Sequence, residues 1–195
     1  VQQIENLFLT AEVNELVALY SALPVLSYPE RWVKRCAEGV RSNIGAALEA
    51  IMCDNPYPAA YLDEPAWNQL ILKAFFTEKP VERIIGIDER ANADLANTLS
   101  DYAHERWAAG RPVNPQIWRC TGKFMNEAIL ADMERLMASE HDFDVEAAAL
   151  ACYESPFPRA KALLNTNPII KTAISSGKLT WNVLAEKMKN YVLQS

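Results

Sequence analysis

The sequence predicts an all-α fold, and two observations carry this prediction. Apolar residues recur with a period near 3.6 through nearly every segment, without the alternation typical of half-buried strands. Proline and asparagine also stand where helices are expected to begin. We expect about ten short helices in a single domain over residues 1–195, stacked as an irregular α-solenoid (HEAT- or TPR-like) or packed as an orthogonal bundle.

The first predicted helix covers residues 4–26. This segment is apolar enough to resemble a targeting element, but Glu5, Glu12 and Glu15 interrupt it and no basic segment precedes it. We therefore expect one amphipathic helix here. The next helix should begin at a capping box formed by Ser27 and Glu30.

Later helix boundaries follow from similar signals. Asp63 followed by Pro65 predicts the start of a helix whose apolar face comprises Trp67, Leu70, Ile71, Ala74 and Phe75. Asn114-Pro115 and Asn167-Pro168 predict two more helix starts, and Ser176-Gly177 predicts a helix end. The one candidate strand, residues 81–87, is short and bracketed by Pro80 and Gly86, so we predict helix there too.

Composition excludes several classes of function. The 195 residues carry a net charge of −6 and no basic run, which argues against non-specific nucleic-acid binding. No apolar run is long enough to span a membrane, and we expect a cytoplasmic protein. The four cysteines are far apart and are predicted to be free thiols. No Cys-x-x-Cys occurs and the two histidines are 37 positions apart, so we expect no metal and no cofactor.

The segment Asp101–Arg111 contains a histidine and two arginines at the end of a predicted amphipathic helix. Helical spacing places Arg106 on the same face as Leu99 and Ala103, where a core residue is expected. A guanidinium group there needs a partner, which is either a carboxylate or a ligand. Asp88 and Glu89 are candidate counter-ions for Arg106 or Arg111. His104 lies beside this face, where a surface or capping role is commoner than a role as a base.

Two further segments offer candidate ligand-binding residues. Between Gly39 and Gly45, backbone amides, Arg41 and Asn43 could hold an anion; the commoner alternative is a helix junction where Gly45 permits close packing. In Asp54–Pro58, two prolines would hold Tyr57 at a fixed angle, either at a binding site or in a plain connector.

Several of these stretches together resemble the EboA family of small bacterial proteins. The resemblance covers residues 39 to about 119 and is carried by Arg41–Gly45, Asn55–Ala59, Trp67–Leu70, Asp88–Arg90, Asp101–Arg111 and Trp118-Arg119. It implies a partner of the other ebo-cluster proteins, which include a UbiA-type membrane prenyltransferase and a TatD-type hydrolase. The cluster is associated with processing or export of secondary-metabolite precursors. The resemblance implies no catalytic activity and assigns no functional residue.

Two functions remain open from the sequence. The first is a non-enzymatic helical protein that binds a metabolite or a partner protein. The second is an enzyme acting on a small anionic or polar-aromatic metabolite, in which Arg41, Arg106 and Arg111 clamp the anion and His104 is the acid or base. The first is favoured because no nucleophile–base pair, metal spacing or phosphate loop is found in the sequence.

Overall fold

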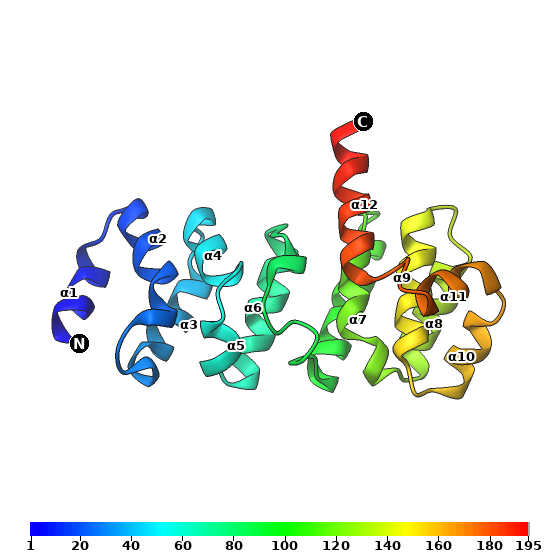
Figure 1. Cartoon of the computed structure of the whole chain (residues 1–195), viewed down its shortest axis with the longest axis horizontal. Coiled ribbons are helices and arrows are strands. Elements are labelled where there is room, and N and C mark those ends of the chain that lie inside the picture. The colour runs from blue at the N-terminus through cyan, green and yellow to red at the C-terminus, as the bar shows by residue number, and fades with distance from the viewer. Residues whose placement is uncertain (195) are drawn as a thin grey trace. The chain divides into compact units, whose positions relative to one another are not determined.

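The computed structural model describes residues 1–194, the side chains of Val192 and Gln194 excepted, and it is built from helices (Figure 1). Twelve α-helices and five 3₁₀-helices occur in these residues, and no strand does. The predicted all-α fold class is therefore confirmed. The chain forms two compact units, Val1–Arg90 and Ala91–Ser195. The expected single domain and the choice between solenoid and bundle stay predictions.

The N-terminal unit contains six α-helices and three 3₁₀-helices. They are α1 (Gln2–Thr10), α2 (Val13–Ser21), η1 (Leu23–Val25), η2 (Pro29–Trp32), α3 (Val33–Arg41), α4 (Gly45–Met52), α5 (Tyr57–Tyr61), α6 (Glu64–Phe76) and η3 (Val81–Arg83). Helix α4 packs against both α2 and α3, and α3 also packs against α6. Trp32, Ile51 and Trp67 are fully buried in this unit.

The single helix predicted over residues 4–26 is wrong. The chain forms α1 and α2, separated at Ala11 and Glu12, whose backbones are extended. Glu12 and Glu15 form a reciprocal capping box that begins α2, so the acidic residues that interrupt the apolar pattern also start a new helix.

The capping box predicted at Ser27 and Glu30 does not form. Residues 29–32 form the 3₁₀-helix η2, and α3 begins after Trp32 without a side-chain cap. Tyr28 adopts the left-handed conformation, with φ of 59°. The Ser27 carbonyl instead accepts a hydrogen bond of 3.0 Å from the Trp32 indole. The backbone conformation here is therefore determined by burial of the Trp32 indole and not by a cap between Ser27 and Glu30.

Helix α6 begins and packs as predicted. The Asp63 side chain accepts a hydrogen bond from the Ala66 backbone amide, and Pro65 lies in the first turn. All five residues of the predicted apolar face are buried, namely Trp67, Leu70, Ile71, Ala74 and Phe75. By contrast, the helix predicted over residues 81–87 does not form in full. Only one 3₁₀ turn, Val81–Arg83, is present, because Gly86 turns the chain with φ of 86°.

Gly39 determines how closely α3 approaches its neighbours. A Cβ atom there would lie 2.5 Å from Ile51 Cδ1 and 2.6 Å from Tyr20 Cζ, both closer than van der Waals contact. Gly45, the glycine expected to permit close packing, meets only the Lys79 ammonium group, at 3.7 Å. The close junction is thus present in the Gly39–Gly45 segment, but at its first glycine.

The C-terminal unit contains six α-helices and two 3₁₀-helices. They are α7 (Ala93–Ala108), η4 (Pro115–Cys120), η5 (Gly122–Phe124), α8 (Glu127–Met137), α9 (Asp142–Glu154), α10 (Pro158–Leu164), α11 (Pro168–Ser175) and α12 (Trp181–Gln194). The helix starts predicted at Asn114 and Asn167 are confirmed by side-chain caps, although the first opens the 3₁₀-helix η4. The end predicted at Gly177 is confirmed by its φ of 73°.

Helix α9 is the centre of this unit. It packs against α8, α10, α11, α12 and both 3₁₀-helices, and Figure 1 shows it among the helices of the yellow to orange part of the chain. Six consecutive residues, 147–152, are buried, and four of them are alanine. A helix that is buried on all sides needs apolar residues all round, and small side chains let several neighbours approach it.

The four cysteines are free and buried, as predicted. Burial raises the pKa of Cys36 and of Cys152 to about 12 and that of Cys53 to about 11, from an ordinary value of 9.0. The thiolate is the reactive form of cysteine, so these side chains are inert in the folded protein at neutral pH.

The first testable prediction concerns the glycine at the helix junction. Gly39→Ala should lower the free energy of unfolding by about 1–3 kcal/mol, because its Cβ overlaps the Tyr20 ring and Ile51. Gly45→Ala is the matched control and should change it by less than about 0.5 kcal/mol. Urea unfolding followed by circular dichroism measures both, and equal effects would show that α3 does not depend on this close approach.

The second prediction concerns the thiols. Native protein at pH 8 should react slowly with an aromatic disulfide reagent, whereas protein in denaturant should show four reactive thiols at once. Because the pKa values are raised in the folded state, the unfolded chain loses these protons first. Stability should therefore fall as pH rises from 9 toward 12. Fast labelling of the native protein would contradict the burial of these thiols.

Candidate functional site

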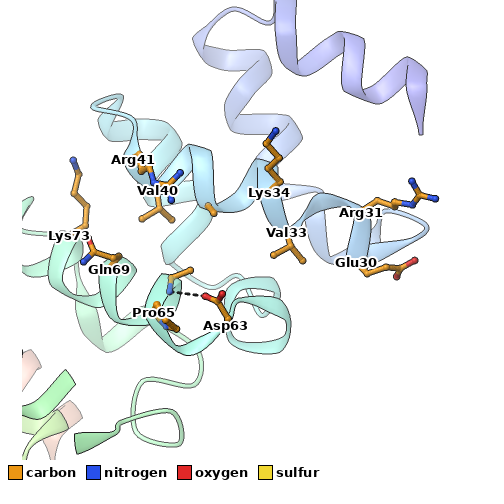
Figure 2. Close-up of a pocket in the computed structure, with 12 residues that line it drawn as sticks. Glu30, Arg31, Val33, Lys34, Val40, Arg41, Asp63, Pro65, Gln69 and Lys73 are labelled. Atoms are coloured by element: carbon orange, nitrogen blue, oxygen red, sulfur yellow. Dashed lines mark hydrogen bonds between the residues drawn. The ribbon is translucent and has the colours of Figure 1, made fainter. Parts of the chain in front are cut away.

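A groove in the N-terminal unit lies between α3 and α6 and has a volume of about 760 Å³ (Figure 2). Its middle is apolar and is formed by Val33, Ala37, Val40, Pro65 and Ala66. Pockets of this volume suit small organic molecules, which such sites hold between apolar walls and a few polar groups. Figure 2 shows Arg41 and Lys73 toward one end of the groove and Glu30 and Arg31 toward the other.

The Arg41 end combines two cations with amide groups. Arg41 is the last residue of α3 and is exposed, and no described residue bonds to its guanidinium group. Lys73 reaches from the last turn of α6 and donates a hydrogen bond of 3.1 Å to Asn43 Oδ1. Gln69, one helical turn before Lys73, also lines the groove. Of the residues predicted from the sequence, Asn43 thus bonds to Lys73, and Arg41 lines the same groove as that lysine.

This end of the groove is suited to an anion. Arg41 and Lys73 supply two positive charges with no carboxylate bonded to either of them in the described residues. Arg31 and Lys34 add positive charge elsewhere on the groove, against Glu30 and Asp63. The six charged lining residues are four cations and two anions, and one of the cations, Lys34, also pairs with Glu38 at 3.8 Å, so the groove is electropositive mainly at its Arg41 end in a chain whose net charge is −6. Such local fields raise the concentration of anionic ligands.

Tyr57 lies outside this groove, in the interior of the unit. It is 1% exposed, and its hydroxyl donates to the Pro29 carbonyl at 2.5 Å. The neighbouring Asn55 is also buried and donates to the Tyr20 and Ala50 carbonyls while accepting from the Tyr57 amide. Burial raises the pKa of Tyr57 above its ordinary range. Through these hydrogen bonds, the Asp54–Pro58 segment holds α2, α4 and η2 together in the interior of the unit.

Arg106 is half-buried, as predicted, and a backbone carbonyl and an aromatic ring contact its guanidinium group. Its Nε donates to the Pro112 carbonyl at 2.8 Å, and its guanidinium group lies 6.0 Å from the centre of the Tyr102 ring. The expected counter-ion is thus replaced by a backbone carbonyl that the chain supplies just after α7. Arg111, which is exposed, lines a second cleft of about 890 Å³ in the C-terminal unit, together with Trp107 and Arg135.

His104 is held by a carboxylate that the sequence did not reveal. Asp132 on α8 is buried, and its Oδ1 lies 2.6 Å from His104 Nε2, while Ser100 Oγ donates to its Oδ2 at 2.7 Å. The imidazole itself is 49% exposed. A buried carboxylate that accepts two hydrogen bonds is compensated for the loss of water, and it fixes the orientation of the ring.

The pair belongs to a polar row along the contact between α7 and α8. Asn97, Ser100, His104 and Trp107 follow one another at intervals of three, four and three residues on α7. Asn97 accepts a hydrogen bond from Asn126, and Trp107 lies 4.1 Å from the Arg135 guanidinium group. This helical spacing is present in the sequence and is the signal for the row, beside the apolar face at Leu95, Leu99 and Ala103.

Within residues 1–194, no group of three or more histidine, cysteine, aspartate or glutamate side chains is placed to hold a metal ion. Among the described helices, none is sufficiently long and apolar to cross a membrane. The prediction that the protein uses no cofactor stays a prediction.

Comparison with known proteins places the chain in a family. It matches the family model EboA, described as metabolite traffic protein EboA, over residues 1–122. Since this is more than half of the 195 residues, the chain belongs to the EboA family of metabolite traffic proteins. No curated protein and no solved structure matches it. The matched residues include the whole groove between α3 and α6.

Proposed function

We propose that this protein binds an anionic metabolite with an apolar body in the groove between α3 and α6, and passes it on chemically unchanged. The observation that carries the proposal is the Arg41 end of the groove, where an unpaired guanidinium group and the Lys73 ammonium group adjoin apolar walls. A carboxylate or sulfonate would pair with these cations, and a planar or branched hydrocarbon would cover Val33, Val40 and Pro65. The family's description as metabolite traffic proteins supports this reading.

Binding is favoured over turnover because the groove supplies charge but no reactive pair. Its lining contains no histidine, cysteine or serine. The alternative enzyme needs Arg41, Arg106 and Arg111 as a clamp with His104 as acid or base. The Arg106 guanidinium group, however, already bonds to the Pro112 carbonyl and faces the Tyr102 ring. Transport requires affinity without transition-state stabilisation, which this arrangement can provide.

Two further parts of the proposal concern the protein's surroundings. We propose that the protein works in the cytoplasm, and its four free thiols support this because thiols persist in a reducing compartment. We also propose that other proteins of the ebo cluster donate or receive the metabolite. The exposed position of the groove supports such an exchange, since ligand can enter and leave without opening a core.

Anilinonaphthalene sulfonate tests the groove, because it joins an anion to an apolar body and fluoresces when shielded from water. Arg41→Gln and Lys73→Gln should each weaken its binding about tenfold, the effect of losing one charge-assisted contact. Neutral phenylnaphthylamine should bind both variants as it binds the unaltered protein. Fluorescence titration measures all of these affinities.

The matched control is Lys178→Gln, which removes an exposed positive charge from outside the groove. It should leave the affinity for the sulfonate unchanged. If it weakens binding as much as Arg41→Gln does, then net charge and not the groove attracts the anion, and the proposed site is wrong. Binding of the neutral probe alone would likewise contradict an anion-binding groove.

A further inference from the structure

The groove between α3 and α6 carries a carboxylate at some distance from its two cations. Figure 2 shows the two helices running in the same direction along it, so that the last turns of both lie at the Arg41 end. Asp63, which also lines the groove, directly precedes α6. Lys73 follows ten positions later, a rise of about 15 Å along the helix axis. Regular helices therefore hold the Asp63 carboxylate apart from the cations.

The Asp63 carboxylate has one oxygen that the fold does not use. Its Oδ1 caps α6 by accepting a hydrogen bond of 2.9 Å from the Ala66 amide. No described residue bonds to Oδ2, and Asp63 is exposed. A ligand in the groove can therefore reach Oδ2 without displacing the cap.

Asp63 also differs from the other charged residues that line the groove away from its two cations. Figure 2 shows Glu30 and Arg31 together at the far end, where their charges offset each other. Lys34 pairs with Glu38 at 3.8 Å. Within the described residues, no cation pairs with Asp63. Asp63 is thus the lining carboxylate that can accept a positive group from a ligand.

We propose that the ligand of this groove is an amino acid of extended shape, with an acid group at one end, an ammonium group at the other and an apolar body between them. The acid pairs with Arg41 and Lys73, and the ammonium group donates to Asp63 Oδ2. This inference rests on the proposed function, because it names the class of ligand for the same groove. With two cations against one carboxylate, the groove also suits a ligand that carries a second acid group and is an anion overall.

The single free oxygen favours an ammonium group over other donors. A guanidinium group typically pairs with a carboxylate through two parallel hydrogen bonds and then needs both oxygens, whereas Asp63 Oδ1 is already occupied. An ammonium group is a compact charge that can pair with one oxygen. A hydroxyl group is a weaker partner, because a hydrogen bond between two charged groups is about twice as strong as one between neutral groups.

The distance along the groove sets the length of the ligand. An extended chain of carbon and nitrogen atoms advances about 1.2 Å per bond, as the backbone does over the three bonds of a residue. In 11-aminoundecanoate the nitrogen and the carboxyl carbon are therefore about 13 Å apart, which is close to the rise of α6 between Asp63 and Lys73. In 5-aminopentanoate they are about 6 Å apart, too short to reach both ends.

The test measures how strongly the protein prefers an acid with an ammonium group. Displacement of anilinonaphthalene sulfonate from the full chain gives the affinities of 11-aminoundecanoate and of undecanoate, both below the concentrations at which they form micelles. Asp63→Asn removes the charge and keeps a residue that caps helices well. We expect the ratio of the two affinities to fall about tenfold in this variant, the loss of one charge-assisted contact.

Two controls match this variant. Glu64→Gln removes the same charge from the neighbouring exposed residue, which does not line the groove, and should leave the ratio unchanged. The ratio for 5-aminopentanoate and pentanoate should not depend on Asp63, because the short chain cannot join the two ends. Comparing ratios also cancels any general effect of an ammonium group on binding.

An unchanged ratio in folded Asp63→Asn protein, as judged by circular dichroism, would overturn the proposal, as would an equal fall in Glu64→Gln. If undecanoate binds and Arg41→Gln weakens it while Asp63→Asn has no effect on the ratio, then this inference alone is wrong. If neither long acid displaces the sulfonate, then the proposed function fails together with it.

Discussion

Helices in both units of this protein approach their neighbours at residues with small side chains, and the rest of each unit is arranged around these contacts. In the N-terminal unit, Gly39 lets α3 lie against Tyr20 and Ile51 at a distance that a Cβ atom would prevent. In the C-terminal unit, the alanines of α9 admit several helices, and a Cβ at Gly122 would lie 2.7 Å from the Ala151 carbonyl oxygen. Interiors packed at this density respond to a change of one methyl group.

These contacts determine which side chains remain available for function. Cys36 and Gly39 are buried on one face of α3. Another face of this helix lies beside α6, and there Val33, Val40 and Arg41 line the groove. The contact between α7 and α8 is polar instead. There the buried Asp132 carboxylate orients the exposed His104 imidazole. The first arrangement supplies charge beside apolar walls, and the second fixes the orientation of an imidazole ring.

The sequence predicted the features that local physics decides. Helix starts at Asp63, Asn114 and Asn167 were found because a side chain caps its own backbone within three residues. Features set by distant partners were missed: Pro112 replaces the expected counter-ion of Arg106, and Asp132 pairs with His104 across 28 positions. Arg41 and Asn43 were identified by residue type, but Lys73, thirty positions beyond Asn43, completes that end of the groove. For Tyr57 the sequence left open a binding site or a plain connector, because its partner, the Pro29 carbonyl, is a backbone atom that residue types do not reveal.

The central claim is that this protein binds a metabolite and does not convert it. Native mass spectrometry of the protein mixed with a metabolite extract, followed by denaturation and analysis of the released molecule, tests this directly. We predict one small anion per chain, recovered with the mass that it had in the extract, and no loss of it beyond the amount of protein added. Loss of many molecules per chain, with a product of different mass, would show that the protein is an enzyme and would contradict the account.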